Sequence, residues 1–158
     1  MKNLIIYFSI FGSTKRFAEM IHQTVGGDLI EIKPVKPYET GYKELMNFSK
    51  KEVDEGILTE FVDPNININD YENVFVGYPM WWYTYPPIIK HFFKKYDMRG
   101  KTVIPFNTHE GSGDGGTYRE IARDLPDSKV LKGLAIRGGD VSEKKLKNIQ
   151  NWLKDIGF

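Results

Sequence analysis

The fold follows from a stretch near the amino terminus that reads Leu4-Ile5-Ile6-Tyr7-Phe8-Ser9-Ile10-Phe11-Gly12-Ser13-Thr14. Its first five residues form a continuous apolar run, which is typical of a strand buried on both faces of a parallel sheet. The next six residues indicate a short polar turn. Apolar residues then recur at helical spacing from Phe17 to Val25, and Gly26-Gly27 ends that helix. The stretch therefore predicts a strand, a turn and a helix.

The same alternation of strand and helix continues along the chain. Further strands are expected at 29–32, 73–78, 102–107 and 130–137, and further helices at 42–55, 88–96, from a glycine-rich loop to about 125, and at 142–156. Five strands that alternate with helices give an α/β fold with a doubly wound parallel sheet and helices on both faces. We predict a single domain over residues 1–158, a length that suits one core.

Three details of this pattern carry specific expectations. Pro105 falls inside the fourth predicted strand, where proline removes a hydrogen-bond donor, so we expect a bulge or an irregular strand end there. Ser142 is a good N-cap for the last helix. In the helix at 42–55, one side should carry Leu45, Phe48, Glu52 and Val53.

Composition excludes several classes of protein. The 158 residues include 22 basic and 21 acidic side chains, for a net charge of +1, so there is no electrostatic footprint for nucleic acid. There is no cysteine, which excludes disulfides, thiolate catalysis and cysteine-based metal sites. The apolar runs are far shorter than the roughly 20 residues of a membrane span. We expect no metal site, no signal peptide, no membrane contact and a cytoplasmic location.

Ligands of doubly wound sheets bind beyond the carboxyl ends of the strands, where the strand order reverses. The first such loop runs from Ser9 to Thr14. Its backbone N–H groups and the positive end of the following helix can hold an anion, and the hydroxyls of Ser9, Ser13 and Thr14 can add hydrogen bonds. The loop matches neither a P-loop nor a dinucleotide fingerprint. An ordinary capped turn is the alternative interpretation.

Two more loops belong to the same edge. Pro79-Met80-Trp81-Trp82-Tyr83 follows the third strand, and its rings can stack on a flat conjugated ligand or can pack in a core or an interface. Thr108-His109-Glu110-Gly111-Ser112-Gly113 follows the fourth strand, and its glycines let the backbone approach a ligand closely. Together the three loops predict a phosphate at one end and a stacked, hydrogen-bonding ring at the other, which describes flavin mononucleotide (FMN).

At these residues the chain resembles the flavodoxin family. Ser9-x-Phe11-Gly12-Ser13-Thr14 is similar to the family's phosphate loop, and Gly77 to Trp82, Thr108 to Gly113 and Leu134 to Gly138 resemble its compact bacterial branch. The resemblance implies a sheet of strand order 2-1-3-4-5, a non-covalent FMN and no catalytic side chains. It assigns to the cofactor the residues Ser9, Phe11, Gly12, Ser13, Thr14, Pro79, Met80, Trp81, Trp82, Tyr83, Thr108, His109, Glu110, Gly111, Ser112 and Gly113, with Trp81 stacked on the ring.

The chain departs from the family pattern in three ways. Phe11 replaces a threonine, so one hydroxyl is lost from the phosphate loop. Trp82 stands where flavodoxins often have a glycine, and tryptophan resists the positive φ that one form of that peptide requires. From this we expect weak stabilisation of the neutral flavin semiquinone. The net charge is near zero, whereas typical flavodoxins are strongly acidic, which helps them dock on basic partners.

Two functions remain open at this point. One is an electron carrier that acts between redox partner proteins, a reductase and an acceptor, as a monomer or weak dimer. The other is an NAD(P)H-dependent FMN oxidoreductase, similar to quinone reductases, that acts on small flat acceptors. The departures from the family pattern and the aromatic loop favour the enzyme, whereas the absence of a visible nicotinamide site argues against it. A binding module without flavin is a third class.

Overall fold

The apolar run at the amino terminus lies inside a parallel sheet in the computed structural model, which describes residues 2–158. Met1, the first residue of the predicted domain, lies outside the described residues. The strand β1 (Lys2–Tyr7) pairs with β2 (Asp28–Glu31) on one side and with β3 (Tyr71–Pro79) on the other, both in parallel. The position of β1 between two strands explains why its residues from Leu4 to Tyr7 are all buried, and Phe8, just after the strand, is buried as well.

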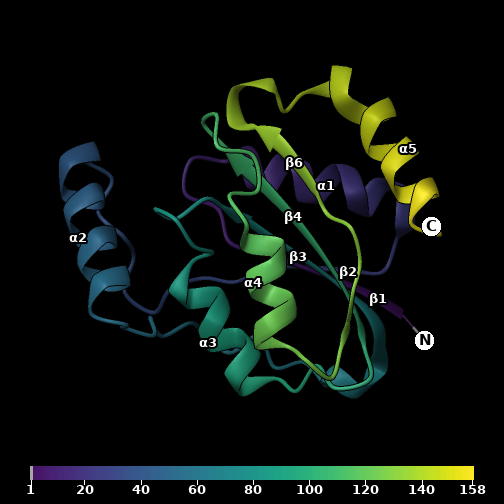
Figure 1. Cartoon of the computed structure of the whole chain (residues 1–158), viewed down its shortest axis with the longest axis horizontal. Helices are drawn as coiled ribbons and strands as arrows, with labels where there is room; N and C mark the ends of the chain where they lie inside the picture. Colours follow the sequence, from purple (N-terminus) through teal and green to yellow (C-terminus); the bar gives the residue numbers. More distant parts are fainter. Residues whose placement is uncertain (1) are drawn as a thin grey trace.

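The strands and helices alternate along the chain as predicted (Figure 1). In chain order they are β1 (Lys2–Tyr7), α1 (Ser13–Val25), β2 (Asp28–Glu31), α2 (Tyr42–Asp54), η1 (Ile68–Asp70), β3 (Tyr71–Pro79), α3 (Pro87–Lys95), β4 (Thr102–His109), α4 (Thr117–Asp124), β5 (Lys129–Val130), β6 (Leu134–Arg137), η2 (Gly138–Asp140), η3 (Glu143–Lys145) and α5 (Leu146–Asp155).

The sheet has the order β2-β1-β3-β4-β5, and β6 also pairs with β4. The predicted order 2-1-3-4-5 is therefore confirmed. The fifth predicted strand, 130–137, is divided into β5 and β6, which occupy the same edge of the sheet one after the other. All these pairings are parallel, so the carboxyl ends of the strands meet at one edge of the sheet.

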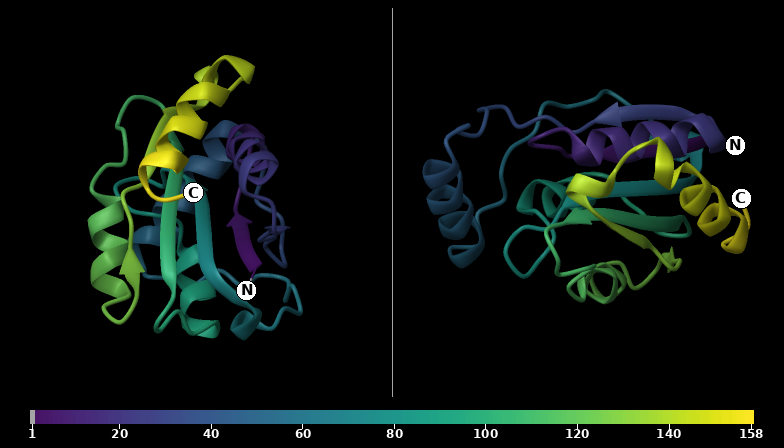
Figure 2. Two further views of the ribbon diagram at one scale, coloured as in Figure 1. Left: turned by 90° about the vertical axis from the view of Figure 1, so that its right-hand side faces the viewer. Right: turned by 90° about the horizontal axis from the view of Figure 1, so that it is seen from above.

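Each face of the sheet carries its own hydrophobic core, because side chains alternate along a strand. Ile5 and Tyr7 of β1 pack in the core that α1 and α5 cover. Leu4 and Ile6 pack in the other core, which α3 and α4 cover. Figure 2 shows the two layers of helices with the sheet between them. A strand buried on both faces is thus what the continuous apolar run produces.

Pro105 causes no irregularity in β4, which corrects the sequence-based expectation. The pairing of β4 with β3 runs without a shift through Val76 and Pro105. The backbone of Val103 faces the other neighbour, since its carbonyl accepts a bond from the N–H of Leu131. Two residues further on, Pro105 faces the same way, toward the break between β5 and β6. The missing donor is accommodated by an interruption in the neighbouring strand.

The last predicted helix begins later than expected. Ser142 does act as a cap, but its hydroxyl accepts a bond from the N–H of Lys144 in the short 3-10 turn η3. The α-helix α5 starts only at Leu146 and ends at Asp155. No helix in residues 2–158 is both long and apolar enough to span a membrane.

Helix α2 lies apart from the other helices, at the left of Figure 1. Its buried residues are Leu45, Ser49 and Glu52, of which two are polar. Phe48, expected on the apolar side, is 41% exposed. Polar contacts therefore contribute much of the attachment of α2, and these contacts lead to the site described next.

Candidate functional site

The three predicted loops line one cavity of about 580 Å³ beyond the carboxyl ends of β1, β3 and β4. The cavity brings together these predicted site residues: Ser9, Phe11, Ser13, Thr14, Pro79, Met80, Trp81, Trp82, Thr108, His109, Glu110 and Ser112. The other predicted residues, Gly12, Tyr83, Gly111 and Gly113, are not among those that line it. Six further residues line the cavity without having been predicted: Ile10, Tyr42, Leu45, Met46, Ser49 and Gly138.

The loop after β1 is shaped by the hydroxyl of Ser9. The Ser9 Oγ accepts bonds from the backbone N–H of Gly12, at 3.2 Å, and of Lys15, at 3.3 Å. Gly12 is the residue before α1 and has a φ of 97°, a left-handed conformation that strains any residue with a Cβ. The sequence needs glycine here because the chain turns sharply into the helix.

Several backbone donors of this loop have no acceptor within residues 2–158. The first turn of a helix lacks intrahelical acceptors, and no protein acceptor lies near the N–H groups of Ile10, Phe11, Ser13 and Thr14. They stand at the positive end of the α1 dipole, which favours an anion. This end of the cavity therefore has the donors that a phosphate needs.

Two of the loop hydroxyls already have protein partners. The hydroxyl of Ser13 donates to the carbonyl of Gly138 at 3.1 Å. The hydroxyls of Thr14 and Thr108 are 2.8 Å apart and buried. These bonds join the start of α1 to the ends of β4 and β6. A hydrogen bond from the Ser13 hydroxyl to a ligand, as predicted, would have to replace its bond to the carbonyl of Gly138.

The loop after β3 forms a tight turn. The backbone of Trp81 exchanges two hydrogen bonds with that of Thr84, and the N–H of Met80 donates to the carbonyl of Thr108 in β4. Trp82, the first residue between Trp81 and Thr84, has a φ of 61°, whereas Tyr83 has a negative φ. A positive φ at that position alone matches a type II′ turn, which prefers glycine there.

Trp82 thus adopts the positive φ that its residue type disfavours. Two bonds between Trp81 and Thr84 close the turn around it, and the indole N–H of Trp82 donates to Ser49 Oγ at 2.9 Å. These contacts hold a tryptophan in a conformation that costs about 1–2 kcal/mol for a residue with a Cβ. The argument for a poorly stabilised semiquinone loses its premise.

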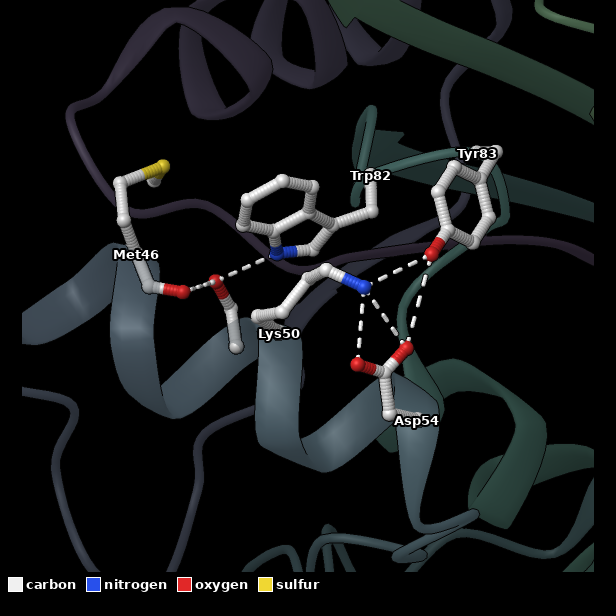
Figure 3. A network of polar contacts seen from close by, with 6 residues as sticks. Met46, Lys50, Asp54, Trp82 and Tyr83 are labelled. Carbon is white, nitrogen blue, oxygen red and sulfur yellow. Dashed lines mark hydrogen bonds and ion pairs between the residues drawn. The ribbon is translucent and has the colours of Figure 1, made fainter.

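The two indoles of the turn have different surroundings. Trp81 is 5% exposed, and its N–H donates to Oε1 of Glu52 at 2.7 Å. Trp82 is 40% exposed and lies along α2, as Figure 3 shows. Both rings line the cavity. The ring expected to form the stacking platform, Trp81, is thus the more deeply buried of the two.

The hydroxyl of Tyr83 points toward Lys50 and Asp54 of α2 (Figure 3), and Tyr83 is not among the residues that line the cavity. Its hydroxyl accepts a bond from Nζ of Lys50 at 3.0 Å, and Lys50 forms an ion pair with Asp54 at 2.8 Å. The same Nζ lies 5.4 Å from the centre of the Trp82 ring. Lys50 therefore contacts both central residues of the turn, Trp82 and Tyr83.

Helix α2 supplies a wall of the cavity that sequence reasoning missed. Tyr42, Leu45, Met46 and Ser49 line the cavity, and their spacing of three and four residues places them on one face of the helix. The sequence does contain that periodicity. It could not show that this face of α2 turns toward the strand ends.

The loop after β4 is held by side chains at its base. Asn107 donates to the carbonyl of Gly113 at 3.0 Å and accepts a bond from the hydroxyl of Tyr118 at 2.5 Å. Burial raises the pKa of Tyr118 above its ordinary range, so its hydroxyl stays protonated and able to donate. His109 Nδ1 accepts a bond from the N–H of Gly111, which leaves Nε2 as its donor.

Comparisons with known proteins agree with this architecture. The model of a family described as flavodoxin matches residues 2–156. A provisionally assigned flavoprotein from Bacteroides eggerthii is 33% identical over 99% of this chain and 98% of that chain, with a TM-score of 0.87. No curated protein matches the chain.

Two more distant structures show the fold alone. A flavoprotein from Lactobacillus acidophilus, solved in complex with FMN, is 21% identical over 94% of this chain and 98% of that chain, with a TM-score of 0.73. An NADH:FMN oxidoreductase is 13% identical over 99% of this chain and 91% of that chain, with a TM-score of 0.57.

Proposed function

Because this chain belongs to the flavodoxin family, we propose that it binds FMN non-covalently in the cavity and carries electrons between partner proteins. The observation that carries the proposal is one cavity with unpaired backbone donors at one end and two indoles at the other. The provisional flavoprotein assignment of its relative and the FMN bound in a more distant one support it.

The residues at the α1 end fit a phosphate. The N–H groups of Ile10, Phe11, Ser13 and Thr14 supply donors without protein acceptors in the described chain, and Ser9 can still donate its hydroxyl proton. Phe11 is 74% exposed, so its backbone and not its side chain serves this end. Backbone N–H groups and the helix dipole together make a helix N-terminus a binding site for a phosphate.

The residues at the other end fit a flat ring. Met80, Trp81 and Trp82 form one wall, and the face of α2 forms another. In the described residues, the N–H groups of Glu110, Ser112 and Gly113 have no protein acceptor, so the loop after β4 can bond to ring carbonyls. Bound FMN would supply the redox chemistry, and the side chains here orient the ring and exclude water from it.

The second candidate, an NAD(P)H-dependent FMN oxidoreductase that acts on small flat acceptors, is favoured by the rings at the cavity. Phe11 and Tyr42 both line it and are each 74% exposed. Exposed aromatic side chains beside a cavity can hold a second flat molecule against the first. The NADH:FMN oxidoreductase among the structural neighbours makes this activity worth testing.

Titration with FMN and with riboflavin tests the binding proposal. Quenching of flavin fluorescence should report a complex, and FMN should bind at least about tenfold more tightly than riboflavin, which is about 1.4 kcal/mol, because riboflavin lacks the phosphate. Colourless protein that binds neither flavin would refute the proposal. Equal affinity for both flavins would refute the assignment of the phosphate end.

Anaerobic mixing of the FMN-loaded protein with NADPH or NADH separates the two functions. Rapid bleaching of the flavin without any other protein would establish the oxidoreductase. Flavin that stays oxidised with both nucleotides, and is reduced only when a flavodoxin reductase is added, would establish the carrier.

A further inference from the structure

Glu52 on α2 is a carboxylate with no exposed surface. In residues 2–158 it has no ion pair, and three neutral groups bond to it instead. Trp81 donates to Oε1, while the hydroxyls of Tyr38 and Thr59 donate to Oε2, with Tyr38 at 2.6 Å. Burying a carboxylate is costly unless its oxygens are bonded, so this arrangement is specific.

The three donors come from three different parts of the chain. Tyr38 lies in the segment before α2, Thr59 in the segment after it, and Trp81 in the turn after β3. One side chain therefore joins both flanks of α2 to the wall of the cavity. Burial, and after it the bond to Glu52, raises the pKa of Tyr38 above its ordinary range, which keeps its hydroxyl protonated.

The Trp81 ring is fixed by packing as well as by this bond. The rings of Phe8, Tyr38 and Trp81 form an aromatic cluster in which the Trp81 ring centre lies 5.5 Å from that of Phe8 and 5.4 Å from that of Tyr38, with the ring planes steeply inclined. Packing restricts the plane of the indole, but the direction of its N–H depends on Glu52. Losing that acceptor would leave a buried donor unpaired.

We propose that Glu52 is a positioning residue, whose buried side chain reaches the Trp81 indole, fixes it and thereby fixes the turn and the α2 wall at the ring end of the cavity. The inference rests on the proposed FMN site. Glu52 itself is not among the residues that line the cavity, so it acts through Trp81 and α2.

Two substitutions separate the reach of the side chain from its charge. Glu52→Gln keeps the length: the amide oxygen can accept from Trp81, and the amide N–H groups can donate to the hydroxyls of Tyr38 and Thr59, which can also act as acceptors. Glu52→Asp keeps the acid but is one methylene shorter, so it cannot reach all three donors. Tyr38→Phe is the matched control, because it removes one bond to Glu52 and leaves the bond to Trp81.

FMN titration and NMR of the indole N–H groups provide the readouts. We expect the FMN dissociation constant to rise at least about tenfold, which is about 1.4 kcal/mol, in Glu52→Asp. It should stay within about threefold of wild type in Glu52→Gln and Tyr38→Phe. The Trp81 indole resonance, assigned with Trp81→Phe, should shift and exchange faster with water in Glu52→Asp and keep its position in Glu52→Gln.

Two results would overturn the inference. One is a folded Glu52→Asp protein with wild-type FMN affinity and an unchanged Trp81 resonance, and the other is equal loss of affinity in Glu52→Gln and Glu52→Asp. If wild type itself binds no FMN, the proposed function fails, but the indole resonances of the flavin-free protein still test the contact between Glu52 and Trp81.

Discussion

Replacing Trp82 by alanine and by glycine separates the strain of its backbone from the contacts of its side chain. Both substitutions remove the bond to Ser49 and the contact with Lys50. Only alanine keeps a Cβ, and the φ of 61° is unfavourable for a residue with a Cβ. The difference in stability between the two variants therefore isolates the backbone.

The magnitude follows from two opposing terms. A left-handed conformation costs a residue with a Cβ about 1–2 kcal/mol. Glycine gains more freedom in the unfolded chain, which costs about 0.4–1 kcal/mol in folding stability. We therefore expect Trp82→Gly to be more stable than Trp82→Ala by about 1 kcal/mol, or about 2–4 °C in Tm for a chain of this size.

The neighbouring residue provides the control, because Tyr83 lies in the same turn with a negative φ. There the same comparison should reverse, with Tyr83→Gly less stable than Tyr83→Ala by about 0.5–1 kcal/mol. Urea unfolding followed by circular dichroism measures all four variants. A Trp82→Ala protein as stable as Trp82→Gly would refute the strained turn.

Two further predictions concern the sheet and its tyrosines. A Cβ at Gly77 would lie 2.2 Å from Cζ of Phe106, so Gly77→Ala should lower the free energy of unfolding by about 1–3 kcal/mol, whereas Gly139→Ala, where a Cβ meets nothing within 4 Å, should leave it nearly unchanged in the same urea assay. Burial, and next to it a neighbouring carboxylate, raises the pKa of Tyr7 and of Tyr71 from the ordinary 10.0 to about 12. The folded state thus favours the protonated phenols, so their contribution to folding stability is complete below pH 10 and is lost as the pH rises through 12. Ultraviolet titration should show that these tyrosines ionise at higher pH in the folded protein than in urea. Coincident titration curves would contradict the prediction.

The strand pattern could be predicted because each strand is marked locally. The apolar run at 4–8, the helical spacing after it and the glycines that end the helix all act within a few residues. The break between β5 and β6 could not be predicted, because it lies beside a proline of a different strand, Pro105 in β4. Proline marks a missing donor in the sequence, but only the sheet shows which neighbour faces it.

The candidate site could be predicted only where it follows strand ends. The three predicted loops meet at one cavity, since the carboxyl ends of parallel strands share one edge. The sequence does not show that α2 forms a wall of the cavity, and its pattern only places Glu52 on the same side of the helix as Leu45 and Val53. Its role depends on Trp81, which lies 29 residues away along the chain. The sequence does not predict the positive φ of Trp82 either, because the residue type argues against the conformation that the turn imposes.

The interruption between β5 and β6 has a consequence for the association of folded chains with one another. Unpaired strand edges are templates on which other chains can add, and short, charged edges resist this. One border of the sheet is β5 and β6, which pair over two and four residues with a gap between them. The opposite border, β2, has four residues and carries the acids Asp28 and Glu31. Neither border offers a long template, which should keep the folded chains from aggregating edge to edge at high concentration.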